Sequence, residues 1–201
     1  MPEKRIILAS RSPRRYELLQ KIVPVENILL VAGNIAESIL PGEDGIKYTR
    51  RVAFAKANDV LMNMVEQRPT DIVLGADTII ELDRELMGKP YDDKSAYKIL
   101  MKLRGRWHRV ITGVCLLIVA SNDKRIFAVS SEVRMRNYPD AEIKDYIKSG
   151  EPLDKAGAYA IQGRGKALVE EYTGSYTNII GLPIEEIAAE LRSMGCEGLL
   201  S

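Results

Sequence analysis

The opening segment of the chain constrains its fold more than any other stretch, because it joins a strand to a helix through one short polar turn. Residues 6–10 (IILAS) are apolar and typical of a buried strand, and residues 13–22 are typical of a helix. Ser12 is placed to cap this helix, and Pro13 then takes the first helical position, where its missing N–H costs nothing. A buried strand that leads directly into a helix predicts an α/β fold.

The turn itself carries more positive charge than the start of a helix favours. Arg14 and Arg15 lie in the first helical turn, where free backbone N–H groups already give a partial positive charge. Arg15 also stands where a capping box would place Glu or Gln. Serine hydroxyls, free N–H groups and two guanidinium groups together suit a bound phosphate. The alternative interpretation is an exposed basic surface turn.

Composition excludes several classes of partner. The formal net charge is +1, with 46% hydrophobic and 28% charged residues, which is typical of a globular protein without a bulk attraction to nucleic acid or anionic membrane. Cys115 and Cys196 show no metal-ligand spacing, no apolar signal segment precedes the first strand, and the apolar run 114–120 is too short to span a bilayer. We therefore expect a soluble, cytoplasmic protein with no nucleic-acid or membrane partner.

Strand-like and helical runs alternate along the rest of the chain, without repeats or a clear linker. The expected strands are 6–10, 27–31, 71–80, 108–120, 124–135 and 167–171. The expected helices are 13–22, 48–66, 93–103, 140–149 and one that begins at 183. This order predicts an α/β fold in which helices flank one long, twisted, mixed β-sheet. We expect one domain over residues 1–201, with two lobes around a cleft.

Two charged residues stand where apolar ones are expected. Asp77 interrupts the most buried-looking strand, and a carboxylate there needs a cation because an unpaired buried charge is costly. It is either half of a structural salt bridge or a metal-binding or general-base carboxylate. Lys56 lies on an apolar helix between Val52 and Val60, where a lysine usually extends its ammonium group to water.

The remaining candidates are weaker by themselves. Lys89 lies in a stiff Gly-Lys-Pro turn that would suit a charge directed at phosphate, and Glu37 precedes a polar, glycine-containing loop. His108 is the only histidine, and its place near a strand start favours a structural hydrogen-bonding role. Small residues in 150–163 would let the backbone approach a ligand, although tight packing would use the same glycines. Together these residues indicate phosphate-ester chemistry with a divalent cation, without naming the substrate.

The order of the motifs resembles the Maf family of nucleoside triphosphate pyrophosphatases over nearly the whole chain. The matching segments are LASRSPRR (8–15), AKA (55–57), GADT (75–78), GKP (88–90), HRVITGV (108–114), GEPLDKAGAY (150–159), IQG (161–163) and GLP (181–183). The resemblance implies a fold similar to the inosine triphosphate pyrophosphatases. It also implies Mg²⁺- or Mn²⁺-dependent hydrolysis of a nucleoside triphosphate to the monophosphate and pyrophosphate, by a cytoplasmic protein that is often a homodimer.

The resemblance also assigns site residues. Asp77 matches the family's catalytic base; with Glu37 it is expected to hold the metal, and Lys56 completes the catalytic set. The expected substrate-binding and specificity residues are Ser10, Arg14, Arg15, Thr78, Lys89 and Gln162. The combination of Arg14, Thr78 and Gln162 is similar to the subgroup that favours dTTP and UTP. The alternatives are a house-cleaning pyrophosphatase for purine or modified nucleotides, and a non-catalytic nucleotide-binding regulator of cell division.

Overall fold

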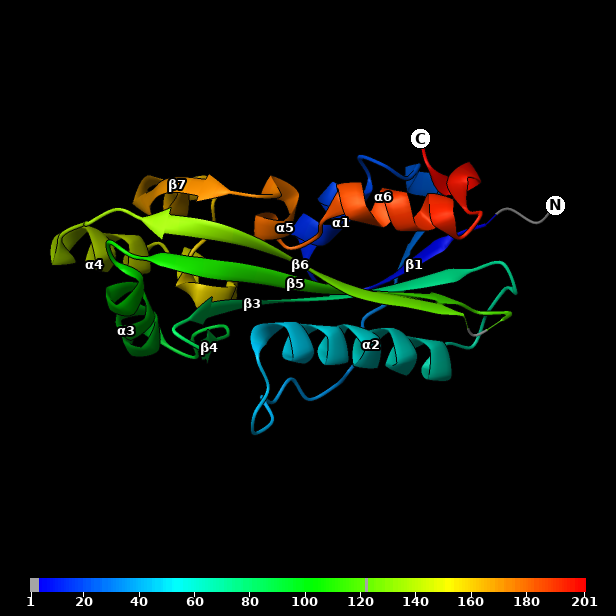
Figure 1. The fold of residues 1–201 in the computed structure, drawn as a ribbon, viewed down its shortest axis with the longest axis horizontal. Helices are drawn as coiled ribbons and strands as arrows, with labels where there is room; N and C mark the ends of the chain where they lie inside the picture. The colour runs from blue at the N-terminus through cyan, green and yellow to red at the C-terminus, as the bar shows by residue number, and fades with distance from the viewer. Residues whose placement is uncertain (1–3, 122) are drawn as a thin grey trace.

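The computed structural model describes residues 4–121 and 123–201, which form an α/β structure around one sheet (Figure 1). The sheet has seven strands in the order β2-β1-β3-β5-β6-β7, with β4 paired to β3 outside this path. The strands are β1 (Ile6–Ala9), β2 (Ile28–Leu30), β3 (Ile72–Leu82), β4 (Glu85–Met87), β5 (Trp107–Ile118), β6 (Lys124–Met135) and β7 (Val169–Thr173). β1 runs parallel to β2 and β3, whereas the other pairings are antiparallel. The predicted mixed sheet is confirmed.

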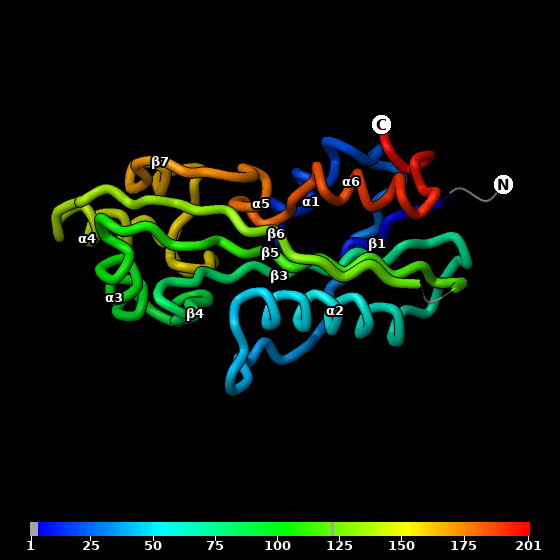
Figure 2. Tube along the Cα trace, in the orientation of Figure 1, coloured from blue at the N-terminus to red at the C-terminus, as the bar shows by residue number. Residues whose placement is uncertain are grey.

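Helices cover both faces of the sheet. They are α1 (Pro13–Leu19), α2 (Gly45–Asn63), α3 (Asp93–Leu103), α4 (Asp140–Lys148), α5 (Tyr176–Ile180) and α6 (Ile184–Ser193). Short 3₁₀ helices complete the set: η1 (Val25–Asn27), η2 (Glu151–Asp154), η3 (Ala156–Ala158), η4 (Gly163–Leu168) and η5 (Glu197–Leu199). Figures 1 and 2 show α2 along one face, α1 and α6 along the other, and α3 and α4 at the far end of the long strands. None of the described helices is long and apolar enough to cross a membrane.

The alternation of side chains along β3 divides the core between the two faces. Ile72 and Leu74 pack in one buried cluster with residues of α1 and α6, whereas Val73 packs in another with Ala53 and Ala57 of α2. Successive side chains of a strand point to opposite faces, so each half of the core takes alternate residues. This strand is the continuous buried run that the sequence predicts.

Two glycines let α2 lie unusually close to the sheet. A Cβ atom on Gly75 would come 2.1 Å from the backbone oxygen of Ala53, and one on Gly113 would come 2.3 Å from the backbone of Thr49. Gly113 is the partner of Asp77 in the β3–β5 register. Because neither glycine has a side chain, the α2 backbone can contact β3 two residues before Asp77 and β5 at the position beside Asp77.

Several element bounds differ from the expectations. Helix α2 begins at Gly45 rather than residue 48, because the Asp44 side chain accepts a hydrogen bond from the Lys47 N–H and caps it. Strand β3 continues to Leu82 and turns into β4, which was not predicted, and α5 was not predicted either. The 3₁₀ helices were not predicted either. For the other elements the differences are confined to their ends: the expected strand 27–31 is β2, the expected strand 167–171 is β7, and the helix expected over 13–22 ends at Leu19.

Candidate active site

A cleft opens where one edge of β3 lacks a neighbouring strand. β1 pairs with β3 as far as Gly75, and β4 takes up the same edge only from Ile80 onward. Between these pairings no described strand covers residues 76–79 on this side. The cavity here has a volume of about 400 Å³, which lies within the range of small-molecule sites.

The structure brings all of the sequence-predicted site residues to this cleft. They lie in the turn after β1, on α1, in the loop before α2, on α2, on β3, after β4 and between η3 and η4. In chain order they are Ser10, Arg14, Arg15, Glu37, Lys56, Asp77, Thr78, Lys89 and Gln162.

One lysine joins the two predicted catalytic carboxylates. Lys56 Nζ lies 2.6 Å from Asp77 Oδ1 and 2.8 Å from Glu37 Oε1. Asp77 is only 5% exposed, and the Lys56 side chain is itself largely buried. Lys56 thus does not extend to bulk water as an isolated helix lysine would. Asp77 thus forms the salt bridge of one interpretation, and its place in the cleft leaves a metal-binding or general-base role as a prediction.

The pKa values of the two carboxyl groups shift in opposite directions. Burial raises the pKa of Asp77 above its ordinary value, although the nearby charges of Lys56 and Arg15 favour the ionised form. Partial burial acts to raise the pKa of Glu37 too, but the hydrogen bond and charge of Lys56, with further charge from Lys89, lower it. Asp77 is consequently the better proton acceptor of the pair, and Glu37 is the more firmly ionised one.

The loop that carries Glu37 is fastened to α2. The Tyr48 hydroxyl donates to the Glu37 carbonyl oxygen at 3.1 Å, and the Asn34 N–H donates to Asp59 Oδ2 at 2.8 Å. Both anchoring side chains belong to α2, which also carries Lys56. A single helix therefore sets the position of Lys56 and of the Glu37 loop relative to β3.

Arg15 is bound mainly by its own protein. Its guanidinium group donates to the Gly181 carbonyl oxygen at 2.9 Å, to Thr78 Oγ1 at 3.1 Å and to Ser10 Oγ at 3.4 Å. Burial lowers its pKa from the ordinary value. Only part of its donor set is left for a phosphate, so Arg15 also fixes the hydroxyl groups of Ser10 and Thr78 at the cleft.

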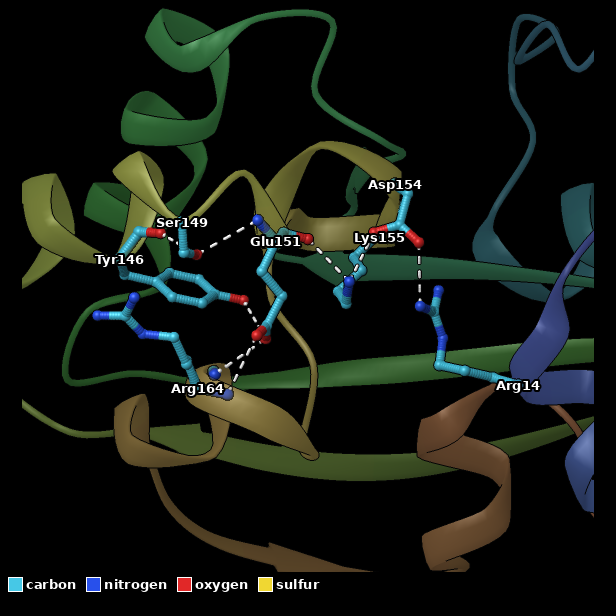
Figure 3. Close-up of polar contacts among 8 residues, drawn as sticks. Arg14, Tyr146, Ser149, Glu151, Asp154, Lys155 and Arg164 are labelled. Atoms are coloured by element: carbon cyan, nitrogen blue, oxygen red, sulfur yellow. Dashed lines mark hydrogen bonds and ion pairs between the residues drawn. The ribbon is translucent and has the colours of Figure 1, made fainter.

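Arg14 is paired across the cleft with a residue that sequence reasoning missed. Arg14 Nη1 lies 3.0 Å from Asp154 Oδ2 (Figure 3). Lys155 lines the same cleft and donates to Asp154 Oδ1 at 2.5 Å and to the Glu151 carbonyl oxygen at 2.8 Å. The sequence signals for Asp154 and Lys155 are the mixture of charged and small residues in 150–163 and the family-like segment 150–159, neither of which assigns them a role.

The base of this segment is held by the Glu151 carboxylate. It accepts hydrogen bonds from the Tyr146 hydroxyl at 3.0 Å and from the N–H groups of Arg164 and Gly165, each at 3.1 Å (Figure 3). These contacts join α4, η2 and η4 on the side of the cleft opposite α1. The segment that ends in Gln162 is thereby fixed at both ends.

Lys89 and Gln162 complete the cleft lining. The Gly88 carbonyl oxygen accepts from the Gly157 N–H at 3.0 Å, which joins the Lys89 turn to the 150–163 segment. Gln162 is exposed and its side chain does not cap the following 3₁₀ helix. Its amide group can therefore turn toward a ligand.

His108 has the structural role that the sequence favours. It is buried, its Nε2 lies 2.7 Å from the Tyr159 hydroxyl oxygen, and the two rings meet edge to face. Burial lowers the pKa of His108 to about 4, so the ring is neutral at neutral pH. It supports Tyr159, which lines the cleft.

The donor set suits a hard divalent cation shared with a ligand. The described residues hold no group of three or more His, Cys, Asp and Glu side chains that could ligate a metal ion. Asp77 and Glu37 nevertheless converge on one lysine, each with a second carboxylate oxygen. Mg²⁺ is commonly held by one or two carboxylates together with substrate phosphates, so two carboxylates in a phosphate-sized cleft fit such an ion.

Known proteins resemble this chain over almost its whole length. Among relatives named dTTP/UTP pyrophosphatase, one from Dictyoglomus thermophilum is 40% identical over 195 residues, covering 96% of this chain and 97% of the relative. Another, from Aromatoleum aromaticum, is 44% identical over 201 residues, covering 96% and 97%. A third, from Clostridioides difficile, is 42% identical over 187 residues, covering 93% of each.

The fold has a distant structural relative as well. A HAM1 protein from Coxiella burnetii superposes with a TM-score of 0.56 at 15% identity, covering 95% of this chain and all of the other, which shows the shared fold alone. The family model described as Maf-like protein matches residues 5–194. With this match, and with relatives that are at least 40% identical over nearly their full length, the chain belongs to the Maf family.

Proposed function

We propose that this protein hydrolyses dTTP and UTP to the monophosphate and pyrophosphate, and that modified pyrimidine nucleotides are further possible substrates. The observation that carries the proposal is the buried Asp77 carboxylate, held by Lys56 beside Glu37 in a cleft with arginine and lysine side chains. The names of the relatives support the same activity. The proposed active unit is one domain of two lobes.

In the proposed reaction, water attacks the α-phosphorus and pyrophosphate leaves. A new bond forms between the water oxygen and the α-phosphorus, the bond from that phosphorus to the bridging oxygen breaks, and its electron pair leaves with pyrophosphate. Asp77 orients the water and accepts its proton, for which a raised pKa is favourable. Arg14, Lys56 and Lys89 offset the negative charge of the triphosphate. Phosphoryl transfer depends mainly on positioning and charge stabilisation, so the cleft needs no covalent nucleophile.

The oxygen ligands of the cleft fit Mg²⁺ or Mn²⁺. Asp77 and Glu37 would hold the ion together with phosphate oxygens of the substrate. When bound, such an ion supplies positive charge that polarises a phosphoryl oxygen. Lys56 keeps both carboxylates near each other until the ion and the triphosphate enter.

Base selection is assigned to Arg14, Thr78 and Gln162. Uracil and thymine present an N3–H donor between two carbonyl acceptors, and the Gln162 amide N–H can donate to one of those carbonyl oxygens. Cytosine presents an acceptor at N3 and an amine at C4, so an amide held in one orientation leaves polar groups unpaired. Such mismatches disfavour CTP relative to UTP.

The test is pyrophosphate release over a panel of dTTP, UTP, CTP and purine triphosphates, with Mg²⁺ or Mn²⁺. We expect release from dTTP and UTP that is lost in Asp77→Asn. Release from purine or modified nucleotides instead would support a different house-cleaning activity. Nucleotide binding without release from any nucleotide would support a regulator of cell division.

We also propose that the protein functions in the cytoplasm. Its two cysteines, Cys115 and Cys196, are free and buried, which fits a reducing compartment. The homodimer implied by the family resemblance stays a prediction, which the mass of the protein in solution would test.

A further inference from the structure

The cleft hydroxyl of Thr78 is one member of a hydrogen-bond chain that continues into the core. Thr78 Oγ1 lies 2.9 Å from Thr112 Oγ1, its partner in the β3–β5 register. Thr112 Oγ1 lies 3.0 Å from the main-chain carbonyl oxygen of Asn178 in α5. At the other end, Arg15 Nη2 lies 3.1 Å from Thr78 Oγ1.

The groups at the two ends of this hydrogen-bond chain fix which hydroxyl donates and which accepts along it. A carbonyl oxygen can only accept, so the single proton of the Thr112 hydroxyl goes to Asn178. Thr112 must then accept from Thr78, which commits the only hydroxyl proton of Thr78. A guanidinium group can only donate, so Arg15 occupies one lone pair of Thr78 Oγ1. One lone pair of Thr78 Oγ1 is left, so Thr78 can accept a hydrogen bond from a ligand but cannot donate one.

The far end of the chain cannot easily rearrange. Thr112 is fully buried, and the Asn178 side chain donates to the Val110 carbonyl oxygen at 3.0 Å and to Ser131 Oγ at 2.9 Å. Asn178 is itself fully buried. The main-chain carbonyl oxygen of Asn178 therefore stays in place as the acceptor of the Thr112 hydroxyl hydrogen bond.

We propose that Thr112 is a positioning residue for base selection. Thr112 accepts a hydrogen bond from the Thr78 hydroxyl, so that Thr78 in turn accepts a hydrogen bond from the N3–H of uracil or thymine. This inference rests on the proposed function and deepens it. Phosphate oxygens offer no proton at neutral pH, and ribose hydroxyls can either donate or accept. The base edge is the part of the substrate that an acceptor-only hydroxyl can discriminate, because cytosine presents a lone pair at N3.

The decisive variant is Thr112→Val, which keeps the shape and removes the hydroxyl. The Asn178 carbonyl oxygen keeps its second donor, the Gly181 N–H at 3.0 Å. The Thr78 hydroxyl loses its acceptor and can rotate toward the cleft, where it can donate a hydrogen bond to N3 of cytosine. We expect the ratio of kcat/KM for UTP to that for CTP to fall by about tenfold or more. Thr112→Ser restores the hydroxyl and should restore the ratio.

A matched control is Thr49→Val in α2. The Thr49 hydroxyl is also fully buried and donates to a backbone oxygen, that of Gly45, at 2.7 Å. Its removal should leave the UTP-to-CTP ratio unchanged. An unchanged ratio in Thr112→Val, an equal loss for both nucleotides, or a Thr112→Ser variant that behaves like Thr112→Val would each overturn the inference.

Binding of the products separates this inference from the proposed function. Calorimetric titration with UMP and with CMP measures base preference without any hydrolysis. A wild-type preference for UMP that Thr112→Val removes supports the inference even if no triphosphate is hydrolysed, an outcome that would refute only the proposed function. If wild type hydrolyses UTP but Thr112→Val keeps the UMP preference, the inference fails and the function stands.

Discussion

The Lys56→Met variant tests how much the charge of Lys56 stabilises the fold by compensating the carboxylates of Asp77 and Glu37. Methionine keeps most of the side-chain length and loses the ammonium group that lies 2.6 Å from Asp77 and 2.8 Å from Glu37. Asp77 is 5% exposed and cannot regain much water when its partner is removed. The variant should therefore unfold at a lower temperature than wild type.

The size of the effect follows from burial. Removing one partner of a buried ion pair typically costs about 3–5 kcal/mol. Glu37 has a side chain that is 45% exposed, so it can rehydrate and adds little. The charge of Arg15 also still favours the Asp77 carboxylate, which places the cost near the lower end, about 3 kcal/mol. For a chain of this size the melting temperature should fall by about 6–12 °C.

The loss of stability should depend on pH in one direction. Without Lys56, burial raises the folded-state pKa of Asp77 still further above its unfolded value of about 3.9. A group whose pKa is raised on folding favours the folded state below the unfolded pKa, and this contribution is lost as pH rises through the folded pKa. The deficit of Lys56→Met should thus be larger at about pH 8 than at about pH 5.

The assay is thermal unfolding of the nucleotide-free protein by circular dichroism across this pH range. Lys56→Met/Asp77→Asn has no buried carboxylate at this position, so it should recover most of the lost stability and lose the added pH dependence. Equal deficits in the single and double variants, or a single variant as stable as wild type at neutral pH, would refute the reasoning.

Three further changes test the cleft. Asp77→Asn should lower kcat by about 10²–10⁴-fold, as measured by pyrophosphate release, and should lower the nucleotide-free melting temperature less than Lys56→Met does, because Lys56 keeps Glu37 as an ion-pair partner; activity above about a tenth of wild type would make Asp77 structural. Gln162→Glu should reduce the preference for UTP over CTP in kcat/KM, and an unchanged ratio would exclude Gln162 from base contact. Gly113→Ala should lower both melting temperature and activity, since its Cβ would come 2.3 Å from the Thr49 backbone and displace α2; normal values of both would contradict the close-approach argument.

The sequence predicts the elements whose signals are local. The strand, turn and helix around Ser12 are where capping and proline chemistry place them, although the Ser12 side chain makes no capping bond and Ser10 Oγ accepts the Ser12 N–H instead. Strand β4 escaped prediction because its hairpin turn uses Asp83 and Arg84 at positive φ, 50° and 67°, rather than the glycine or asparagine that normally signals such a turn. Helix α5 has only five residues, too few for a periodic pattern.

The sequence predicts which residues line the candidate site better than it predicts how those residues are arranged. Asp77 and Lys56 stand out as charges in apolar surroundings, and the family resemblance supplies the rest. Their 2.6 Å contact depends on how closely α2 approaches the sheet, which Gly75 and Gly113 permit. Nothing local marks these glycines. The pairing of Arg14 with Asp154 likewise joins residues 140 positions apart, so only the folded chain reveals it.

The placement of Asp77 beside Thr78 separates two tasks within one cleft. Successive residues of a strand point to opposite faces, so Asp77 faces Lys56 on α2 while Thr78 faces Arg15 on α1 and Thr112 on β5. The uncovered edge of β3 at residues 76–79 makes both side chains accessible to one ligand. Substitutions of Asp77 or Lys56 should therefore change the rate for all nucleotides alike, whereas substitutions of Thr78 or Thr112 should change the ratio between nucleotides.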